Sequence, residues 1–393
     1  MEGACASLFL SWQWGLERAS DRTTAAGEAG AATPERWYAA AAPSDIPSEA
    51  AAPDAWEAGR TADAKARLAE QALQPPSRAE ALARRHWLTR PGSYWDQFYA
   101  ANTDAFFRDR HYLGAEFRTP LALGLPAAPA PAGGLWVLDF GCGVGNAAVP
   151  LLKSHPGVRV AAFDISRRAV DILASLKRDA LAGGQEWATR LVGPVAHDCT
   201  DVEATGAACS PGDGSGGVQG SLPSIASPLS APAGARKRGG FDACLLIFVL
   251  SAVPPGVPQM RCLTAARRAL RPGGRILFRD YAAMDEAQLR FHGSRRIDTL
   301  PAAASAAVPA AGGGGGGVGA GSRLYARGDG TLSYFFEPAE LIRLAAAAGL
   351  EVLEMRPLLR KVRNRATGAE VRRVWLQAVL QRPADGAQLL ASR

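Results

Sequence analysis

A chain of 393 residues is long enough for one large domain with additional segments, and its 48% hydrophobic and 21% charged residues are an ordinary globular composition. No run of eighteen apolar residues occurs, so we predict no membrane span. The net charge of +7 is compatible with binding a nucleic acid, but a general bias toward Ala, Gly and Arg explains it equally well. The six cysteines form no CxxC pair and no zinc-type spacing with histidine, which predicts reduced thiols and no metal site.

The N-terminal extension, residues 1–88, is rich in Ala, Pro and Glu and weakly patterned. We expect it to be mostly disordered, apart from a short helix from Ala55 to Leu73, where apolar residues recur at helical spacing. Arg18 and Arg22 fit an organellar leader, whereas the acidic residues around them argue against one. We therefore expect a cytoplasmic protein, with the nucleus as a second compartment, and leave organellar import open.

The patterned domain covers residues 89–385 and begins with an aromatic-rich segment from Tyr94 to Leu113, which predicts an amphipathic helix on a core. Short apolar strands then alternate with helices, and two long strands end the domain. The predicted strands are 135–140, 158–165, 188–196, 241–250, 274–281, 351–362 and 370–381, with helices at 167–181, 259–270 and 337–348. This order predicts an α/β, doubly wound, Rossmann-like fold, with a mainly parallel seven-stranded sheet and an antiparallel C-terminal hairpin.

Two inserts, residues 204–240 and 299–321, interrupt this order. Both consist largely of Gly, Ser, Pro and Ala, and the second contains six consecutive glycines. Such segments bury too little apolar area to offset the entropy lost on ordering. We expect both to be disordered surface loops.

A glycine loop follows the first predicted strand. Gly141, Gly143 and Gly145 have the spacing G-x-G-x-G, which differs from the G-x-G-x-x-G of dinucleotide enzymes. Glycine is needed where the backbone turns tightly and approaches a ligand closely. The second strand ends near Asp164, a residue that can accept hydrogen bonds from both hydroxyls of a ribose. Together they predict a site for an adenosine-containing ligand, the alternative being a plain turn with a solvated aspartate.

Three further residues are candidates for the same site. Asp198 follows the third strand and is placed to meet an adenine amino group, with Cys199 beside it. The alternative for Asp198 is a turn or cap residue. Ile247 lies in the fourth strand near the edge where such sheets bind ligands, and it fits both a core and a ligand-contact role.

Several segments between Tyr94 and Pro383 resemble the tRNA 3-methylcytidine methyltransferases, a branch of the methyltransferase-like proteins that use S-adenosylmethionine. The matching segments, in order, are 94–99, 106–111, 141–146, 164–170, 246–253, 277–281, 289–291, 325–327 and 329–336. The glycine loop is generic, whereas FFRDRH, LIFVLSAV and LFRDY are much more specific. The chain departs from the family at Tyr112, where Trp is usual, and at Cys199, where Leu or Val is common.

The resemblance implies a class I methyltransferase that modifies a cytidine at position 32 in the anticodon loop of certain tRNAs. It also implies that the cofactor pocket is lined by Trp95, Tyr99, Gly141, Asp164, Asp198 and Ile247. An aminoacyl-tRNA synthetase or another accessory protein is an additional expected partner.

The chemistry requires little of the protein beyond alignment and exclusion of water, because N3 of cytosine already carries a lone pair. N3 lies on the pairing edge, so the base must be turned into the pocket, where aromatic and arginine side chains would stack on it and hold phosphates. Our candidates for contact with tRNA are Arg108, Arg110, Arg279, Tyr281, Tyr325 and Arg327, each with a packing role as the alternative. Asp280 is the candidate catalytic carboxylate, which would stabilise positive charge on the methylated ring; the alternative is an ion pair with a nearby arginine.

Two other functions remain open at this point. A methyltransferase of the same fold that acts on a small molecule or protein is the first, because fold does not determine substrate. A non-enzymatic scaffold with a relict pocket is the second. The specific segments argue against the first, and the intact glycine loop with Asp164 argues against the second.

Overall fold

The computed structural model describes residues 53–74, 78–104, 107–117, 134–201, 232–236, 239–297, 323–363 and 370–384. Residues 1–52, nearly all of both inserts and the turn at 364–369 lie outside the described residues, so the expectations for them stay predictions. None of the helices in the described ranges is both long and apolar enough to cross a membrane.

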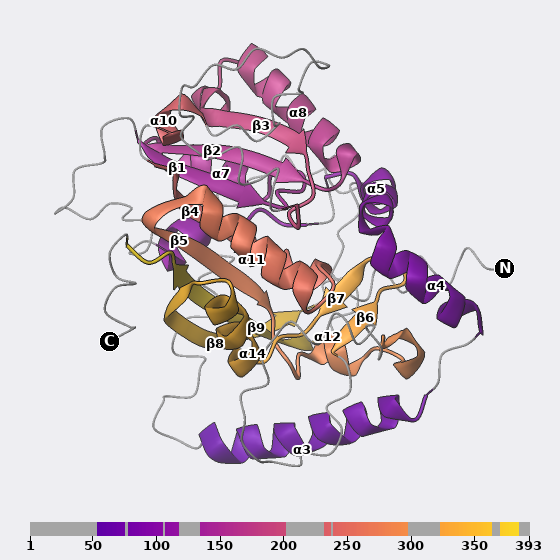
Figure 1. The fold of residues 1–393 in the computed structure, drawn as a ribbon. Helices are drawn as coiled ribbons and strands as arrows, with labels where there is room; N and C mark the ends of the chain where they lie inside the picture. Colours follow the sequence, from indigo (N-terminus) through magenta and orange to yellow (C-terminus); the bar gives the residue numbers. More distant parts are fainter. Residues whose placement is uncertain are drawn as a thin grey trace, which may run out of the picture.

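A seven-stranded sheet forms the centre of the molecule, with strand order β3-β2-β1-β4-β5-β9-β8 (Figure 1). Its first five strands are parallel, and β9 and β8 close one edge in antiparallel pairing. The strands are β1 (Leu135–Phe140), β2 (Val158–Asp164), β3 (Leu191–Ala196), β4 (Phe241–Ile247), β5 (Leu270–Tyr281), β8 (Glu351–Arg363) and β9 (Glu370–Gln381). The predicted doubly wound α/β fold is confirmed.

Helices cover both faces of the sheet, as the buried strands require. Side chains of β4 alternate between two hydrophobic clusters: Leu246 belongs to one and Leu245 to the other. The helices are α3 (Pro53–Ala72), α4 (Arg78–Thr89), α5 (Pro91–Asn102), α6 (Leu113–Glu116), α7 (Ala148–Ser154), α8 (Arg167–Ala182), α10 (Ala233–Arg236), α11 (Val257–Ala269), α12 (Glu286–Leu289) and α14 (Pro338–Ala347). A small antiparallel pair, β6 (Leu324–Ala326) and β7 (Leu332–Tyr334), was not predicted.

The N-terminal region contains more regular structure than the sequence pattern indicated. A helix, α3, occupies the place of the expected short helix, and a second one, α4, lies in a stretch expected to be disordered. Helix α3 is attached near its end by Gln71, whose amide donates to the carbonyl of Gln288 at 3.0 Å and accepts from the hydroxyl of Tyr325 at 3.0 Å. Contacts more than two hundred residues away in the chain therefore order this segment.

The end of the first insert is ordered, which corrects the expected boundary at residue 240. Helix α10 lies there, and Ala235 is fully buried in the cluster that also contains Trp136. A Cβ added at Gly234 would lie 2.7 Å from Nε1 of Trp136, so only glycine allows this approach. Tertiary packing overrides the loop-like composition of these residues.

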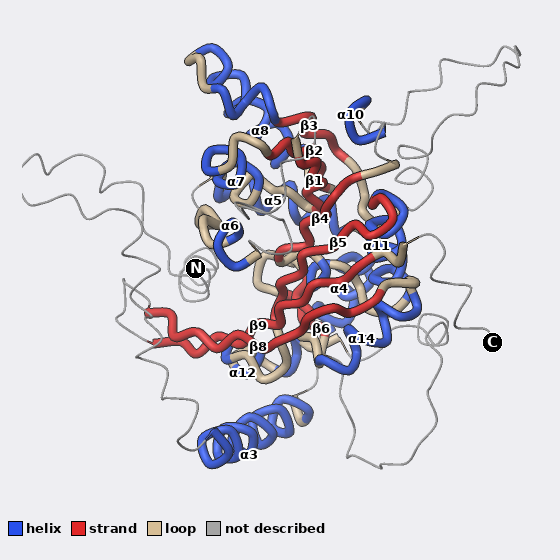
Figure 2. Tube along the Cα trace, turned by 90° about the vertical axis from the view of Figure 1, so that its left-hand side faces the viewer, coloured by secondary structure: helices blue, strands red, loops and turns tan. Residues whose placement is uncertain are grey.

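The C-terminal hairpin extends beyond the rest of the sheet (Figure 2). β9 pairs with β5 only from Trp375 to Gln381, whereas its first residues, Glu370–Val374, pair with β8 alone. The hairpin therefore has one half inside the sheet and one half that projects from it.

Candidate active site

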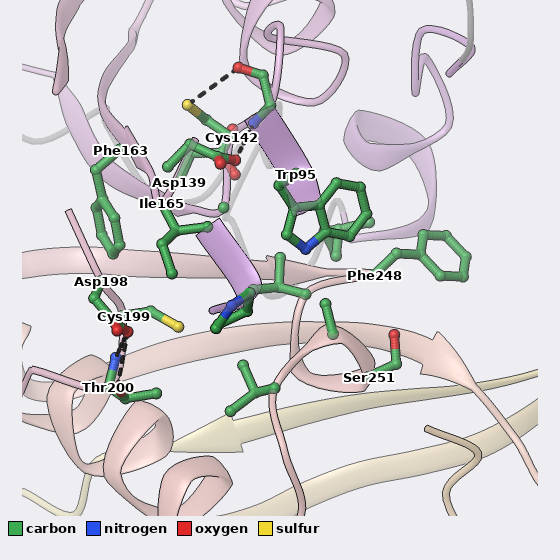
Figure 3. A pocket seen from close by; sticks show the side chains of 18 of the residues that line it. Trp95, Asp139, Cys142, Phe163, Ile165, Asp198, Cys199, Thr200, Phe248 and Ser251 are labelled. Carbon is green, nitrogen blue, oxygen red and sulfur yellow. Dashed lines mark hydrogen bonds between the residues drawn. The ribbon is translucent and has the colours of Figure 1, made fainter. Parts of the chain in front are cut away.

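A cavity of about 270 Å³ opens where β1, β2 and β4 end, at the edge where doubly wound sheets bind ligands. Asp198, Cys199 and Thr200 lie at one end of it, and Phe248 lies at the other, with Trp95 nearby (Figure 3). Of the predicted site residues, the following line the cavity: Trp95, Tyr99, Arg110, Gly141, Gly143, Asp164, Asp198, Cys199, Ile247, Tyr281 and Arg327. The cavity therefore brings together most of the residues predicted for the site, although they make up only part of its lining.

The glycine loop turns from β1 toward α7 with left-handed backbone at all three glycines. A Cβ at Gly143 would lie 2.5 Å from the hydroxyl of Tyr99, so a side chain there would displace a cavity-lining ring. Gly145 lies outside the cavity lining, and a Cβ there would meet Leu173 at 2.7 Å. Its predicted contact with the cofactor is therefore replaced by a role in packing the loop against α8.

Asp164 connects the end of β2 to the glycine loop. Its two oxygens accept hydrogen bonds from the backbone N–H groups of Gly143 at 2.7 Å and Ser166 at 2.8 Å. Burial raises the pKa of Asp164 to about 6, although these two hydrogen bonds oppose the shift. Each carboxylate oxygen can accept a further hydrogen bond, so the site retains acceptors for a pair of ribose hydroxyls.

Asp139 is a second buried carboxylate in the cavity wall, and it was not predicted from the sequence. Its Oδ2 atom has no hydrogen-bond partner within the described part of the chain. Burial raises the pKa of Asp139 to about 7, with Arg110 opposing the shift and Asp164 adding to it. A signal was present, because an acidic residue at the end of a buried strand stands two positions before Gly141. A buried acceptor without a partner fits an ammonium group of a ligand.

The segment 107–111 lies against Asn146, which follows the glycine loop, and two of its residues, Phe107 and Arg110, line the cavity. The side-chain amide of Asn146 donates to the carbonyl of Phe107 at 3.0 Å, and the backbone carbonyl of Asn146 accepts from the backbone N–H of Arg110 at 2.7 Å. The guanidinium of Arg110 donates to the carbonyl of Ile247 at 2.5 Å. Arg110 therefore lies in the cofactor cavity, while Arg108 is exposed and does not line it.

Two predicted tRNA contacts are structural instead. Arg279 is only 1% exposed; it pairs with Glu116 and Gln377, and its guanidinium carbon lies 4.1 Å from the ring centre of Tyr112. Tyr325 is also buried and stacks on Phe291 with ring centres 4.8 Å apart. Neither lines the cavity, so the prediction that they contact the substrate is corrected.

Asp280 is fully buried beside the cavity and does not line it. Its oxygens accept hydrogen bonds from the backbone N–H groups of Ser251 and Tyr281, each at 2.9 Å. Burial raises its pKa to about 6, and these hydrogen bonds and the charge of Arg110 oppose the shift. Asp280 thus holds two cavity-lining residues in place. Its predicted catalytic role stays a prediction, and Arg279 pairs with Glu116 rather than with Asp280.

Asp198 has the turn role that was the alternative prediction, and its contact with adenine stays a prediction. Its Oδ1 accepts hydrogen bonds from the N–H and the hydroxyl of Thr200, both at 2.8 Å, which is an Asx turn. The residue is exposed and lines the cavity. Within the described residues, no group of three His, Cys, Asp or Glu side chains could hold a metal ion.

Comparison with known proteins identifies the family. The family model described as "Methyltransferase domain" matches residues 106–355. The Drosophila melanogaster tRNA N(3)-methylcytidine methyltransferase Mettl2 is 30% identical over 84% of this chain and 82% of its own length. The Rattus norvegicus tRNA N(3)-cytidine methyltransferase METTL6 is 30% identical over 74% of this chain and 78% of its own. The Saccharomyces cerevisiae tRNA(Thr) (cytosine(32)-N(3))-methyltransferase is 27% identical over 75% of this chain and 37% of its own. The chain therefore belongs to the tRNA N(3)-methylcytidine methyltransferase family.

Proposed function

We propose that this chain transfers a methyl group from S-adenosylmethionine to N3 of a tRNA cytidine, and that the target is cytidine 32 of the anticodon loop. The observation that carries the proposal is the cavity at the ends of β1, β2 and β4, with Asp139 and Asp164 in its wall, in a chain of this family. The position rests on the resemblance of the sequence segments to the family and on the name of the yeast relative.

The residues present fit the cofactor. Asp164 would hold the ribose hydroxyls, and the Asp198 end of the cavity would hold the adenine. Asp139, with its oxygen that lacks a partner, would hold the ammonium of the methionine part. Arg110, one of two arginines in the cavity lining, would hold the carboxylate of that part. When bound, the cofactor supplies a methyl group made electrophilic by positively charged sulfur.

The protein has to align the base with the methyl group and exclude water from the cavity; it does not have to move a proton. The N3 atom of neutral cytosine has a free lone pair, so no cavity residue is required as a base. The half-buried rings of Trp95, Phe107 and Phe248 exclude water from the side of the cavity that a base would enter. Tyr281 and Arg327 also line the cavity, and together with Arg110 they are the predicted tRNA contacts found there.

The proposal is tested on purified protein with tRNA transcripts and labelled cofactor. We expect label to be transferred to a transcript with cytidine 32 and not to one with uridine at that position. Nucleoside mass spectrometry should identify the product as 3-methylcytidine. Label on a cytidine elsewhere would overturn the position, and no label on any tRNA would overturn the function. Adding an aminoacyl-tRNA synthetase tests the proposed accessory partner. The compartment stays a prediction.

A further inference from the structure

The geometry points to Phe248 as the side chain on which the target base stacks, an inference that rests on the cytidine methylation proposed above. Phe248 directly follows β4, and its half-buried ring lines the end of the cavity opposite Asp198 (Figure 3). The Asp198 end, which would hold the adenine, and the Phe248 end are thus separated by the length of the cavity. The reacting base belongs at the end far from the adenine.

Aromatic and arginine side chains gather at this end, and we call them the aromatic–arginine rim (Trp95, Arg110, Phe248, Tyr281 and Arg327). The guanidinium carbon of Arg327 lies 6.0 Å from the ring centres of both Trp95 and Tyr281. The rings of Tyr281 and Phe248 have centres 5.0 Å apart, and the guanidinium carbon of Arg110 lies 5.2 Å from the centre of Phe248. Such rings and guanidinium planes are the surfaces on which unpaired bases stack.

The backbone of Phe248 is held in an unusual conformation. Its φ of +58° lies in the left-handed region, which bulky residues rarely adopt. Its N–H donates to the carbonyl of Arg279 at 2.7 Å, which holds the residue against β5. Thr103 and Met284, the other non-glycine residues of the described chain with positive φ, lie outside the cavity lining. Strain of this kind persists where the surroundings enforce it, and it is concentrated at functional sites.

The reaction gives an aromatic ring at this position a role in the rate as well as in binding. The N3 lone pair forms the new bond to the methyl carbon while the carbon–sulfur bond breaks, and that electron pair stays on sulfur. Positive charge moves from sulfur to the base, and no proton moves. Because an aromatic face attracts a cation, stacking on Phe248 would strengthen as the base becomes charged.

The test combines a binding signal with a rate. A tRNA transcript with the fluorescent analogue pyrrolocytidine at the target position reports stacking as quenching, and the unmodified transcript gives the single-turnover rate. The variants are Phe248→Leu, which keeps apolar bulk, Phe248→Tyr, which restores a ring, and Phe248→Gly, which relieves the backbone strain. Phe335→Leu is the matched control, because the ring centre of Phe335 lies 5.7 Å from that of Tyr281 and Phe335 does not line the cavity.

Phe248→Leu should lose the quenching and lower the single-turnover rate by about 10- to 100-fold, which is within the size of the effect that base–aromatic stacking has on binding, with cofactor affinity unchanged. Phe248→Tyr should restore both, Phe248→Gly should lose both while remaining folded, and Phe335→Leu should keep both. Quenching that persists in Phe248→Leu or Phe248→Gly, a tyrosine variant as poor as leucine, or a parallel loss of cofactor affinity would overturn the inference. If the wild type methylates no tRNA, both the proposed function and the stacking role are wrong. If the wild type and Phe248→Leu methylate equally, only the stacking role is wrong.

Discussion

The carboxylate of Asp164 accepts a hydrogen bond from the N–H of Gly143 across 2.7 Å, which joins the end of β2 to the glycine loop. Asp164→Ala removes this link together with the acceptor for the ribose hydroxyls. Because each lost hydrogen bond to a charged group is worth about 1.5–3 kcal/mol, we expect S-adenosylmethionine to bind at least about tenfold more weakly. Calorimetric titration measures this, with Asp171→Ala on the exposed face of α8 as control. Wild-type affinity in Asp164→Ala would contradict the assignment.

The raised pKa of Asp139 should make cofactor affinity depend on pH. Its pKa is raised to about 7, so lowering the pH from 8 to 6 protonates it and removes the partner for the ammonium. Wild-type affinity should fall across this range, by up to about tenfold per pH unit below the pKa, and Asp139→Asn should bind weakly with little pH dependence. Titrations at several pH values check this, and an unchanged pH profile in the variant would contradict it.

The stability of the free protein should change in the opposite direction. A carboxyl group whose folded pKa is raised binds its proton more tightly when folded than when unfolded. Asp139 therefore lowers the free energy of unfolding as the pH rises from about 4 to about 7, and Asp164 and Asp280 add to this decline up to about pH 6. Thermal unfolding without cofactor measures it, and Asp139→Asn should flatten the part between pH 6 and 7.

Arg108 and Arg110 should separate tRNA binding from cofactor binding. Arg108 is exposed, so Arg108→Ala should weaken tRNA binding, reduce its salt dependence and leave cofactor affinity unchanged. Arg110 lines the cavity and is held by Ile247, so Arg110→Ala should lower cofactor affinity. Binding of labelled tRNA at several salt concentrations, alongside cofactor titration, distinguishes the two variants. Equal effects of both on the cofactor would contradict the separation.

Asp280→Asn tests whether the negative charge of Asp280, which lies beside the cavity, stabilises positive charge on the methylated base. The amide keeps one acceptor but loses the charge that the buried carboxylate carries above its pKa of about 6. We expect the single-turnover rate at pH 8 to fall about ten- to a thousand-fold, the scale of other preorganised electrostatic groups, with tRNA and cofactor affinities little changed. A rate equal to the wild type, measured with saturating tRNA, would contradict an electrostatic role of Asp280.

Two replacements of the first insert should behave differently. A short Gly/Ser linker in place of residues 206–230 should leave thermal unfolding and methylation nearly unchanged, because loop closure depends only weakly on length. Extending the replacement to residue 238 deletes α10 and the buried Ala235, and should lower the melting temperature by several degrees. Equal melting temperatures would show that α10 adds no stability.

The sequence predicted what depends on local pattern. The strands of the seven-stranded sheet, the glycine loop and Asp164 were predicted because each is recognisable from a few consecutive residues. The different positions of Arg108 and Arg110 could not be predicted, because they depend on contacts between distant parts of the chain. Asn146 donates to Phe107, 39 residues away, and Arg110 donates to Ile247, 137 residues away. Arg279 was placed in the site for the same reason: its partner Glu116 is 163 residues away.

The position of Arg110 has a thermodynamic consequence for the order in which ligands act. One guanidinium lies in the cofactor cavity and 5.2 Å from the ring of Phe248. The cofactor and a base stacked on Phe248 would both contact this guanidinium, so we expect the two binding events to be coupled. Coupling is reciprocal: the factor by which cofactor tightens tRNA binding must equal the factor by which tRNA tightens cofactor binding. Arg110→Ala would then reduce both factors equally.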